Sequence, residues 1–304
     1  MQIAVTGATG LIGTALTAAL RAEGHDVRPV VRRPSDEPGA VRWDPAAGEI
    51  DAAGLEGLDA VVHLAGAGIG DRRWTAARKQ EILSSRTRGT GLLARTLAGL
   101  DRPPAVLLSG SAVGVYGDRG DEELTEASPP GEGFVADVVR AWEAAAAPAA
   151  EAGIRTVFLR SGLVLAGHGG ILPRMALPFR LGVGGRLGSG KQWLSWISID
   201  DEVAAIRFLA SAQEVSGPVD LVAPGAVTNA ELTAVMGRVL HRPTLVPVPA
   251  VGLRLALGRE MADQLLFISQ RVRPAVLTGA GFTFRHPDLE TALRAVLGRE
   301  EAAA

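Results

Sequence analysis

Residues 1–13 read MQIAVTGATGLIG, and this stretch decides the fold of the chain. A short apolar run at residues 3–5 leads into a glycine-rich turn, and apolar residues then recur at steps of three and four, which indicates a helix. The order strand, glycine-rich turn, helix is typical of a unit that binds a dinucleotide. Gly7 would allow the tight turn, Gly10 would let the backbone approach a pyrophosphate, and Gly13 would let the helix pack close to its strand. A plain strand–helix turn is the alternative, and the position of the motif between a strand and an amphipathic helix favours dinucleotide binding.

The composition excludes several classes of function. The chain has 304 residues, of which 47% are hydrophobic and 21% charged, as in a folded globular protein, and its net charge of −2 argues against a nucleic-acid partner. It contains no cysteine, and its five histidines are scattered without metal-ligand spacing, so we expect no disulfide and no metal site. It has no apolar run of about 18 residues and no signal peptide, which predicts a cytoplasmic protein without membrane contact.

The second predicted strand, residues 25–31, ends in Val31, Arg32 and Arg33. An NAD-binding fold places a carboxylate here, against the ribose 2′-hydroxyl. Arginine instead suits the additional 2′-phosphate of NADP, because its planar guanidinium pairs with phosphate oxygens. We predict that Arg32 binds this phosphate, although one or both arginines could simply end a solvated strand.

The next buried strand, residues 59–64, closes in Leu64, Ala65 and Gly66, whose small size would let a cofactor lie across the backbone. The predicted helix at residues 71–100 carries Arg86 on its apolar face, four residues after Ile82. A cation on that face needs a partner, which is either a cofactor group or a protein carboxylate. Glu81, at the cofactor end of the same helix, could accept a hydrogen bond from a ribose hydroxyl.

Strands and helices alternate up to about residue 165, which predicts an α/β protein with a Rossmann-type, doubly wound parallel sheet. We assign residues 1–165 and about 197–223 to this domain. Residues 166–196, whose Gly and Pro content predicts a long ordered loop, and the mainly helical residues 224–304 would form a smaller substrate lobe. We expect Trp74 and Trp196 to contact the substrate.

Several motifs resemble the extended short-chain dehydrogenase/reductase family of the nucleoside-diphosphate-sugar epimerase type. They are TGATGLIG at 6–13, HLAG at 63–66, SGSAVGVYG at 109–117 and WISIDD at 196–201. An epimerase-like subfamily with a C-terminal domain of unknown function is closer still. Its hallmarks resemble RW at 73–74, KQEILSSR at 79–86, PFRLGVGGRLGSGKQWLSWI at 178–197 and MADQLLFISQRVRP at 261–274.

The resemblance implies an NADP(H) cofactor. The contacts that it implies fall on Gly7, Gly10, Gly13, Arg32, Leu64, Ala65, Glu81, Arg86 and Val164. The complete predicted cofactor site also includes the neighbouring residues Thr9, Leu11, Ile12, Val31 and Gly66.

The chain departs from the family at the expected catalytic pair. Redox members use a Tyr and a Lys four residues apart on one helix, and the matching positions here are Val135 and Val139. Tyr116 is the only tyrosine, and the residue four positions after it is Gly120. Ser111 matches the serine that polarises a substrate carbonyl in relatives, or else it satisfies a backbone group at the strand end.

Two functions remain open on the sequence alone. The first is an NADP(H)-dependent, epimerase-like oxidoreductase in which Ser111, Tyr116 or a water supplies the proton. Its substrate would be a small molecule such as a nucleotide sugar or another carbonyl compound. The second is a non-catalytic NADP(H)-binding sensor or regulatory protein. The sequence determines neither the substrate nor the oligomeric state.

Overall fold

The computed structural model describes residues 1–298, and the last six residues of the predicted lobe, 299–304, lie outside the described part. The strands are β1 (Gln2–Thr6), β2 (Asp26–Val31), β3 (Val41–Asp44), β4 (Glu49–Ile50), β5 (Ala60–His63), β6 (Val106–Ala112), β7 (Glu123–Leu124), β8 (Arg155–Ser161), β9 (Leu163–Leu165), β10 (Trp193–Leu194), β11 (Trp196–Ser198), β12 (Gly217–Leu221), β13 (Val227–Thr228) and β14 (Arg271–Val272). The helices are α1 (Leu11–Ala22), α2 (Ala76–Ala98), α3 (Phe134–Ala144), α4 (Ala147–Glu151), α5 (Leu172–Arg180), α6 (Ile199–Ser211), α7 (Asn229–Leu240), α8 (Ala250–Leu257), α9 (Arg259–Leu265), α10 (Ala275–Gly279) and α11 (Leu289–Val296). Two short 3₁₀ turns cover Ala53–Leu55 and Val113–Tyr116.

The centre of the molecule is an eight-stranded sheet in the order β12-β8-β6-β5-β1-β2-β3-β4. All neighbouring strands are parallel except β3 and β4. The chain moves outward from β1 through β2 and β3 and then returns to β5 on the other side of β1. The reversal lies at β1 and β5, and doubly wound sheets bind ligands beyond the carboxyl ends of the strands at such a reversal. The predicted Rossmann architecture is confirmed.

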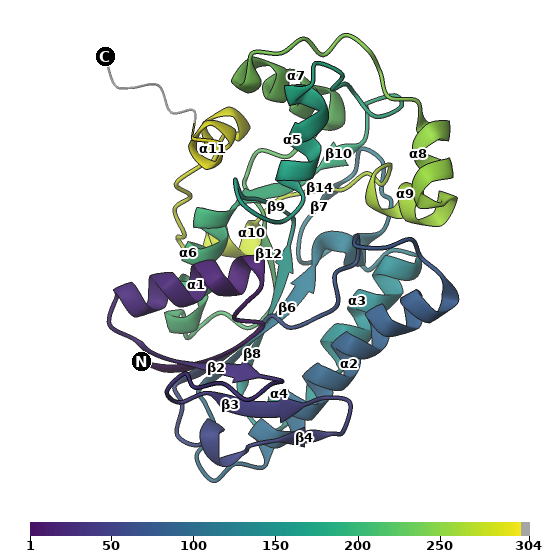
Figure 1. The fold of residues 1–304 in the computed structure, drawn as a ribbon. Coiled ribbons are helices and arrows are strands. Elements are labelled where there is room, and N and C mark those ends of the chain that lie inside the picture. Colours follow the sequence, from purple (N-terminus) through teal and green to yellow (C-terminus); the bar gives the residue numbers. More distant parts are fainter. Residues whose placement is uncertain (299–304) are drawn as a thin grey trace, which may run out of the picture.

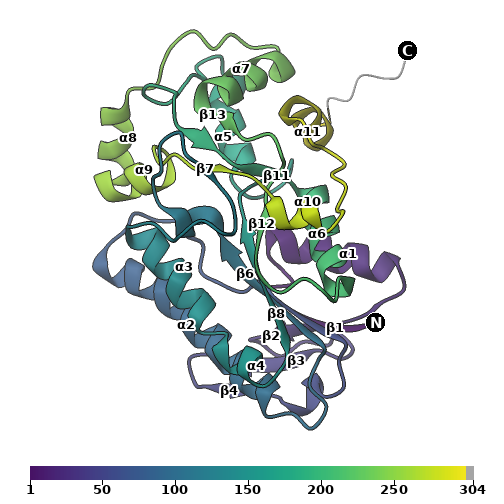
Figure 2. The same ribbon diagram turned by 180° about the vertical axis from the view of Figure 1, so that it is seen from behind.

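Helices cover both faces of the sheet, as Figures 1 and 2 show. Ile3 and Val5 of β1 pack in one apolar cluster with α1 and α6, whereas Ala4 between them packs in a second cluster with α2 and α4. Alternate residues of a strand point to opposite faces, so a parallel strand covered on both sides is apolar throughout.

A smaller part of the molecule, mostly helical, lies beyond the carboxyl edge of the sheet (Figure 1). There α5, α7 and α11 surround their own apolar cluster, which contains Phe179, Trp196, Met236 and Leu293. The exact boundaries of the two predicted domains stay a prediction. None of the helices in residues 1–298 is long and apolar enough to cross a membrane.

Three elements differ from the sequence prediction. Helix α2 begins at Ala76 rather than near residue 71, because Thr75 caps it by accepting a hydrogen bond from the Arg78 N–H at 3.2 Å. Residues 132–152, whose apolar spacing predicts one helix, form two helices, α3 and α4, with Pro148 in the first turn of the second. Residues 172–180, expected to be loop, form α5, since Pro173 is tolerated in its first turn and apolar packing outweighs Pro178 inside it.

Candidate functional site

Gly7, Gly10 and Gly13 form a cradle between the end of β1 and the start of α1. Gly7 has a φ of +67°, and a Cβ atom there would lie 2.9 Å from the carbonyl carbon of Leu64. A Cβ atom at Gly13 would lie 2.1 Å from the carbonyl oxygen of Gly7, so both positions require glycine. Gly10 caps α1 without a side-chain hydrogen bond. The N–H groups of the first turn therefore point outward from the N-terminus of α1.

A buried hydrogen-bond network fixes residues 64–65, the wall opposite this cradle. The Thr6 hydroxyl oxygen accepts from the N–H groups of both residues, at 3.1 and 3.2 Å, and it lies 2.7 Å from Nδ1 of His63. Because both lone pairs of Thr6 are used, its proton goes to Nδ1, so Nε2 of His63 is the nitrogen that donates to Thr90 at 2.8 Å. Trp142 also donates to the Thr90 hydroxyl, at 2.9 Å. Burial lowers the pKa of His63 to about 4, as suits a neutral core histidine.

Several predicted cofactor contacts gather around the cradle. Leu11, Ile12, Leu64 and Val164 border the same apolar cluster, although they come from α1, the end of β5 and β9. Thr9 is exposed at the turn.

Arg32 and Arg33 follow Val31 at the end of β2, the strand beside β1. Both side chains are exposed, and neither forms an ion pair or hydrogen bond with any other residue of 1–298. The nearby Glu37 is instead paired with Arg21. The two guanidiniums are therefore available to an anion at the carboxyl edge of the sheet.

Arg86 is largely buried against the segment that follows β5. It donates to the carbonyl oxygens of Ala67 at 2.9 Å and Ile82 at 3.2 Å, and its guanidinium lies 4.9 Å from the Trp142 ring centroid. No carboxylate of residues 1–298 pairs with it, and burial together with nearby Arg78 lowers its pKa to about 10. Of the two predicted partners, the protein carboxylate is absent from the described structure. Gly66 lies directly beside this guanidinium.

Glu81 is exposed and forms an ion pair with Arg78 at 2.8 Å. Its carboxylate is thus engaged on the outer side of α2, and a ribose contact would require this pair to open.

Ser111, at the end of β6, donates its hydroxyl to Glu143 of α3 at 2.6 Å. The same carboxylate forms a two-pronged ion pair with Arg160 of β8, at 2.8 and 2.9 Å. These contacts link Ser111 to a fixed charge pair across two strands and a helix.

Arg160 also connects this pair to a buried tyrosine. It donates to the Tyr116 hydroxyl at 3.0 Å, and Tyr116 donates to Asp220 of β12 at 2.8 Å. Burial raises the pKa of Tyr116 above its usual range, and burial together with nearby Glu126 raises the pKa of Asp220 to about 8. Tyr116 is fully buried and hydrogen-bonded in both directions, an arrangement that favours a structural role over proton donation.

Val135 and Val139 of α3 are buried beside Tyr116 in one apolar cluster. At the start of α3, Gln264 of α9 accepts a hydrogen bond from the Val135 N–H at 3.0 Å. The C-terminal segment therefore covers the helix end that carries the tyrosine in redox relatives. Gln264 was not identified from the sequence. The one feature that could have pointed to it is its polar amide within the mainly apolar residues 261–268.

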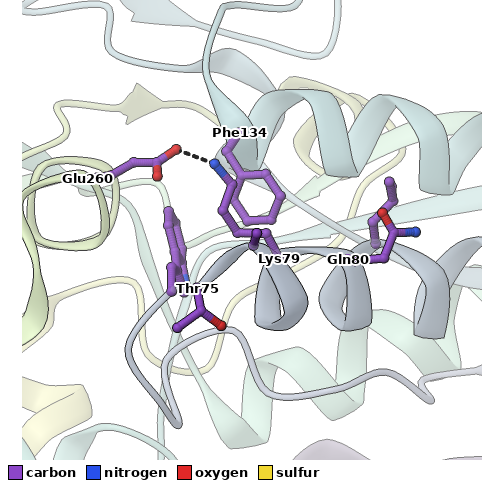
Figure 3. Close-up of a pocket in the computed structure, with 8 residues that line it drawn as sticks. Thr75, Lys79, Gln80, Phe134 and Glu260 are labelled. Atoms are coloured by element: carbon purple, nitrogen blue, oxygen red, sulfur yellow. Dashed lines mark hydrogen bonds and ion pairs between the residues drawn. The ribbon is translucent and has the colours of Figure 1, made fainter.

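A hollow of about 470 Å³ lies where α2, α3 and α9 meet, and Figure 3 shows its lining. Trp74 and Phe134 form its aromatic wall, with ring centroids 4.9 Å apart in an edge-to-face arrangement. Lys79 lies 4.7 Å above the Phe134 ring and forms an ion pair with Glu260 at 2.7 Å. Of the two tryptophans predicted to contact substrate, Trp74 lines this hollow.

Trp196 lies elsewhere, in the core of the C-terminal lobe. It is 1% exposed, and its indole N–H donates to the Gly225 carbonyl oxygen at 2.8 Å. Its environment supports a packing role. No group of three or more potential metal-binding side chains occurs among the described residues.

Comparisons with known proteins show the family of the chain. Residues 3–222 match the NAD dependent epimerase/dehydratase family, and residues 248–296 match DUF1731, a domain of unknown function. An epimerase family protein of Mycobacterium bovis is 45% identical over 291 residues, which make up 96% of each chain. The crystal structure of the human epimerase family protein SDR39U1 (isoform 2) with NADPH is 38% identical, with a TM-score of 0.90 over 98% of this chain and 99% of that one.

A more distant structure, MoeE5 in complex with UDP-glucuronic acid and NAD, shares the fold at 22% identity. Its TM-score is 0.77, and the match covers 98% of both chains. The family resemblance predicted from the motifs is thus confirmed, and the chain belongs to the NAD dependent epimerase/dehydratase family.

Proposed function

We propose that the chain binds NADPH across the carboxyl ends of β1, β2 and β5 and uses it to reduce a carbonyl group of a small molecule. One observation carries the proposal: the glycine cradle stands beside two exposed arginines that have no partner within residues 1–298. The diphosphate would lie at the N-terminus of α1, and the 2′-phosphate would pair with Arg32. The human relative SDR39U1, solved with NADPH, supports this choice of cofactor.

When bound, NADPH would supply a hydride, and the residues of the chain would position both reactants. Residues 64–65 are held rigidly by Thr6 and His63, so they would form a fixed surface for the cofactor. Arg86 lacks a carboxylate partner and would bind a ribose or phosphate oxygen.

The proton would come from a water molecule that the Ser111 oxygen orients, or from Ser111 once its hydroxyl turns away from Glu143, in which case solvent water returns a proton to the serine. Val135 and Val139 cannot transfer a proton, and the Tyr116 hydroxyl is fully buried. The hydrogen bond to Glu143 fixes the Ser111 side chain. We place the substrate, a nucleotide sugar or another carbonyl compound, in the hollow lined by Trp74 and Phe134.

A test is the oxidation of NADPH by the purified chain in the presence of small aldehydes, ketones and keto sugars. We expect turnover above background with at least one class and a large loss in Ser111→Ala. Bound NADPH without any turnover would overturn the catalytic part of the proposal.

That outcome would favour the second candidate, an NADP(H)-binding sensor. The observation behind it is the start of α3, where Val135 replaces the expected tyrosine and Gln264 of the C-terminal segment covers the helix end. Limited proteolysis with and without NADPH distinguishes the two, because a sensor changes its exposed segments when the cofactor binds.

A further inference from the structure

Exposed aliphatic side chains gather on one part of the C-terminal lobe, formed by α5, α8 and the loops beside them. Seven such residues are between 55% and 88% exposed: Leu177, Leu181, Val183, Leu245, Val246, Val251 and Leu255. Monomeric proteins rarely leave large aliphatic residues exposed in such a cluster without a binding role.

Hydrogen bonds hold these two segments side by side in one surface, which we call the basic apolar face (residues 174–191 and 242–255). Arg242 donates to the carbonyl oxygen of Arg180 at 3.2 Å, where α5 ends. Val248 then pairs with Arg186 and Gly188, at 2.8 and 3.0 Å. Helix α8 follows directly, and none of its residues is buried.

The charge of this face differs from that of the whole chain, which has 31 basic and 33 acidic residues. Its residues 174–191 contain three arginines and one lysine, and its residues 242–255 contain two more arginines, yet neither segment contains an Asp or Glu. Arg254 forms an ion pair with Asp263 of α9. The other five basic side chains have no carboxylate partner within residues 1–298: Arg174, Arg180, Arg186, Lys191 and Arg242.

These features select among the possible partners. A second copy docking through the same face would bring like charges together, which opposes a symmetric dimer. A face that combines aliphatic residues with unpaired cations matches a surface with anionic groups above an apolar layer. A surface of this kind lies in the lipid headgroup region, with its leucines and valines inserted into the apolar layer.

We propose that the basic apolar face docks the protein peripherally onto membranes that contain anionic lipids. The sequence-based expectation of no membrane contact rested on the lack of a spanning segment, and peripheral docking needs none. The contact is independent of the cofactor site and would hold the protein at a lipid surface.

The test is co-sedimentation of the full chain with vesicles at low ionic strength. We expect binding to phosphatidylcholine vesicles that contain phosphatidylglycerol, no binding to pure phosphatidylcholine, and release at high salt. Arg180→Glu with Arg242→Glu should weaken binding at least about tenfold, and so should Leu181→Ser with Leu255→Ser.

A matched charge reversal at two exposed arginines of the Rossmann domain, Arg42→Glu with Arg88→Glu, should change binding less than about twofold. Circular dichroism and thermal melting confirm that all variants are folded. The proposal is overturned if the protein binds no anionic vesicle. It is equally overturned if the charge reversal at Arg42 and Arg88 weakens vesicle binding as much as the one at Arg180 and Arg242. It is also overturned if light scattering shows a dimer that Leu181→Ser with Leu255→Ser converts to a monomer.

Discussion

Tyr116 donates its hydroxyl proton to the buried carboxylate of Asp220 at 2.8 Å, across 104 residues of sequence. Arg160 donates to the same hydroxyl from the other side, so the only tyrosine of the chain links a buried arginine to a buried acidic side chain. The contact joins the 3₁₀ turn after β6 to β12 at the edge of the sheet. The contact gives Tyr116 a structural role in holding the site together.

Tyr116→Phe should therefore destabilise the fold. It removes the donor to Asp220 and the acceptor of Arg160, and leaving a buried polar group without its partner costs about 1–3 kcal/mol. Urea denaturation measures the loss, with Ser111→Ala as a variant that keeps the Tyr116–Asp220 contact. An unfolding free energy within about 0.5 kcal/mol of wild type would show that the contact is not a structural link.

Arg86→Met should weaken NADPH binding at least about tenfold, because a charge-assisted hydrogen bond contributes about 1.5–3 kcal/mol. Arg88→Met, at an exposed position on the same helix, is the matched control and should leave affinity unchanged. Wild-type affinity in Arg86→Met would mean that the carbonyl oxygens of Ala67 and Ile82 are its functional partners.

The stability of the chain should depend on pH through Glu202, a fully buried residue of α6. Ser161 donates to one carboxylate oxygen at 2.6 Å, the other has no partner in the described structure, and burial raises the pKa to about 8. Between the unfolded pKa, about 4.5, and the folded value, the native state holds a proton that the unfolded chain releases. Stability therefore falls as the pH rises through this interval.

Glu202→Gln stays neutral, so its melting temperature should exceed that of wild type by an amount that grows from about pH 5 to about pH 9. Glu214→Gln, exposed beyond the end of α6, should show no such trend. A constant difference across this range would mean that Glu202 is already ionised in the folded protein at low pH.

Epimerisation of common UDP- and GDP-sugars should be absent. The helix position of the expected tyrosine is Val135, and a general acid–base group contributes about 10² to 10⁴ in rate. Coupled assays with NAD(P) and UDP-glucose, UDP-galactose or GDP-mannose measure the epimerase activity. Robust activity in wild type would refute the assigned register, and Ser111→Ala and Tyr116→Phe would then identify the group that acts.

Local sequence predicted the geometry of the glycine cradle well. Gly7 and Gly13 are required by atoms only a few residues away or on the adjacent strand, so a short motif reports them reliably. The strand–helix alternation likewise revealed the sheet, because each buried strand is a short apolar run.

Contacts between distant residues were not predictable. Lys79 and Glu260 are 181 positions apart and Val135 and Gln264 are 129 apart, and no periodic pattern connects either pair. Nothing in the local sequence distinguishes Trp196, which is buried, from Trp74, which lines a hollow, since each precedes a helix. Helix α5 escaped prediction because its two prolines and the surrounding glycines are typical of loops.

The most direct test of the proposed function is a fluorescence titration of wild type and Arg32→Ala with NADPH and NADH. Each contact of an arginine with the 2′-phosphate should contribute about 1.5–3 kcal/mol, so wild type should prefer NADPH at least about tenfold. Arg32→Ala should lose most of this preference while its melting temperature stays unchanged. Equal affinities of the wild-type protein for the two cofactors would contradict the proposed NADPH site.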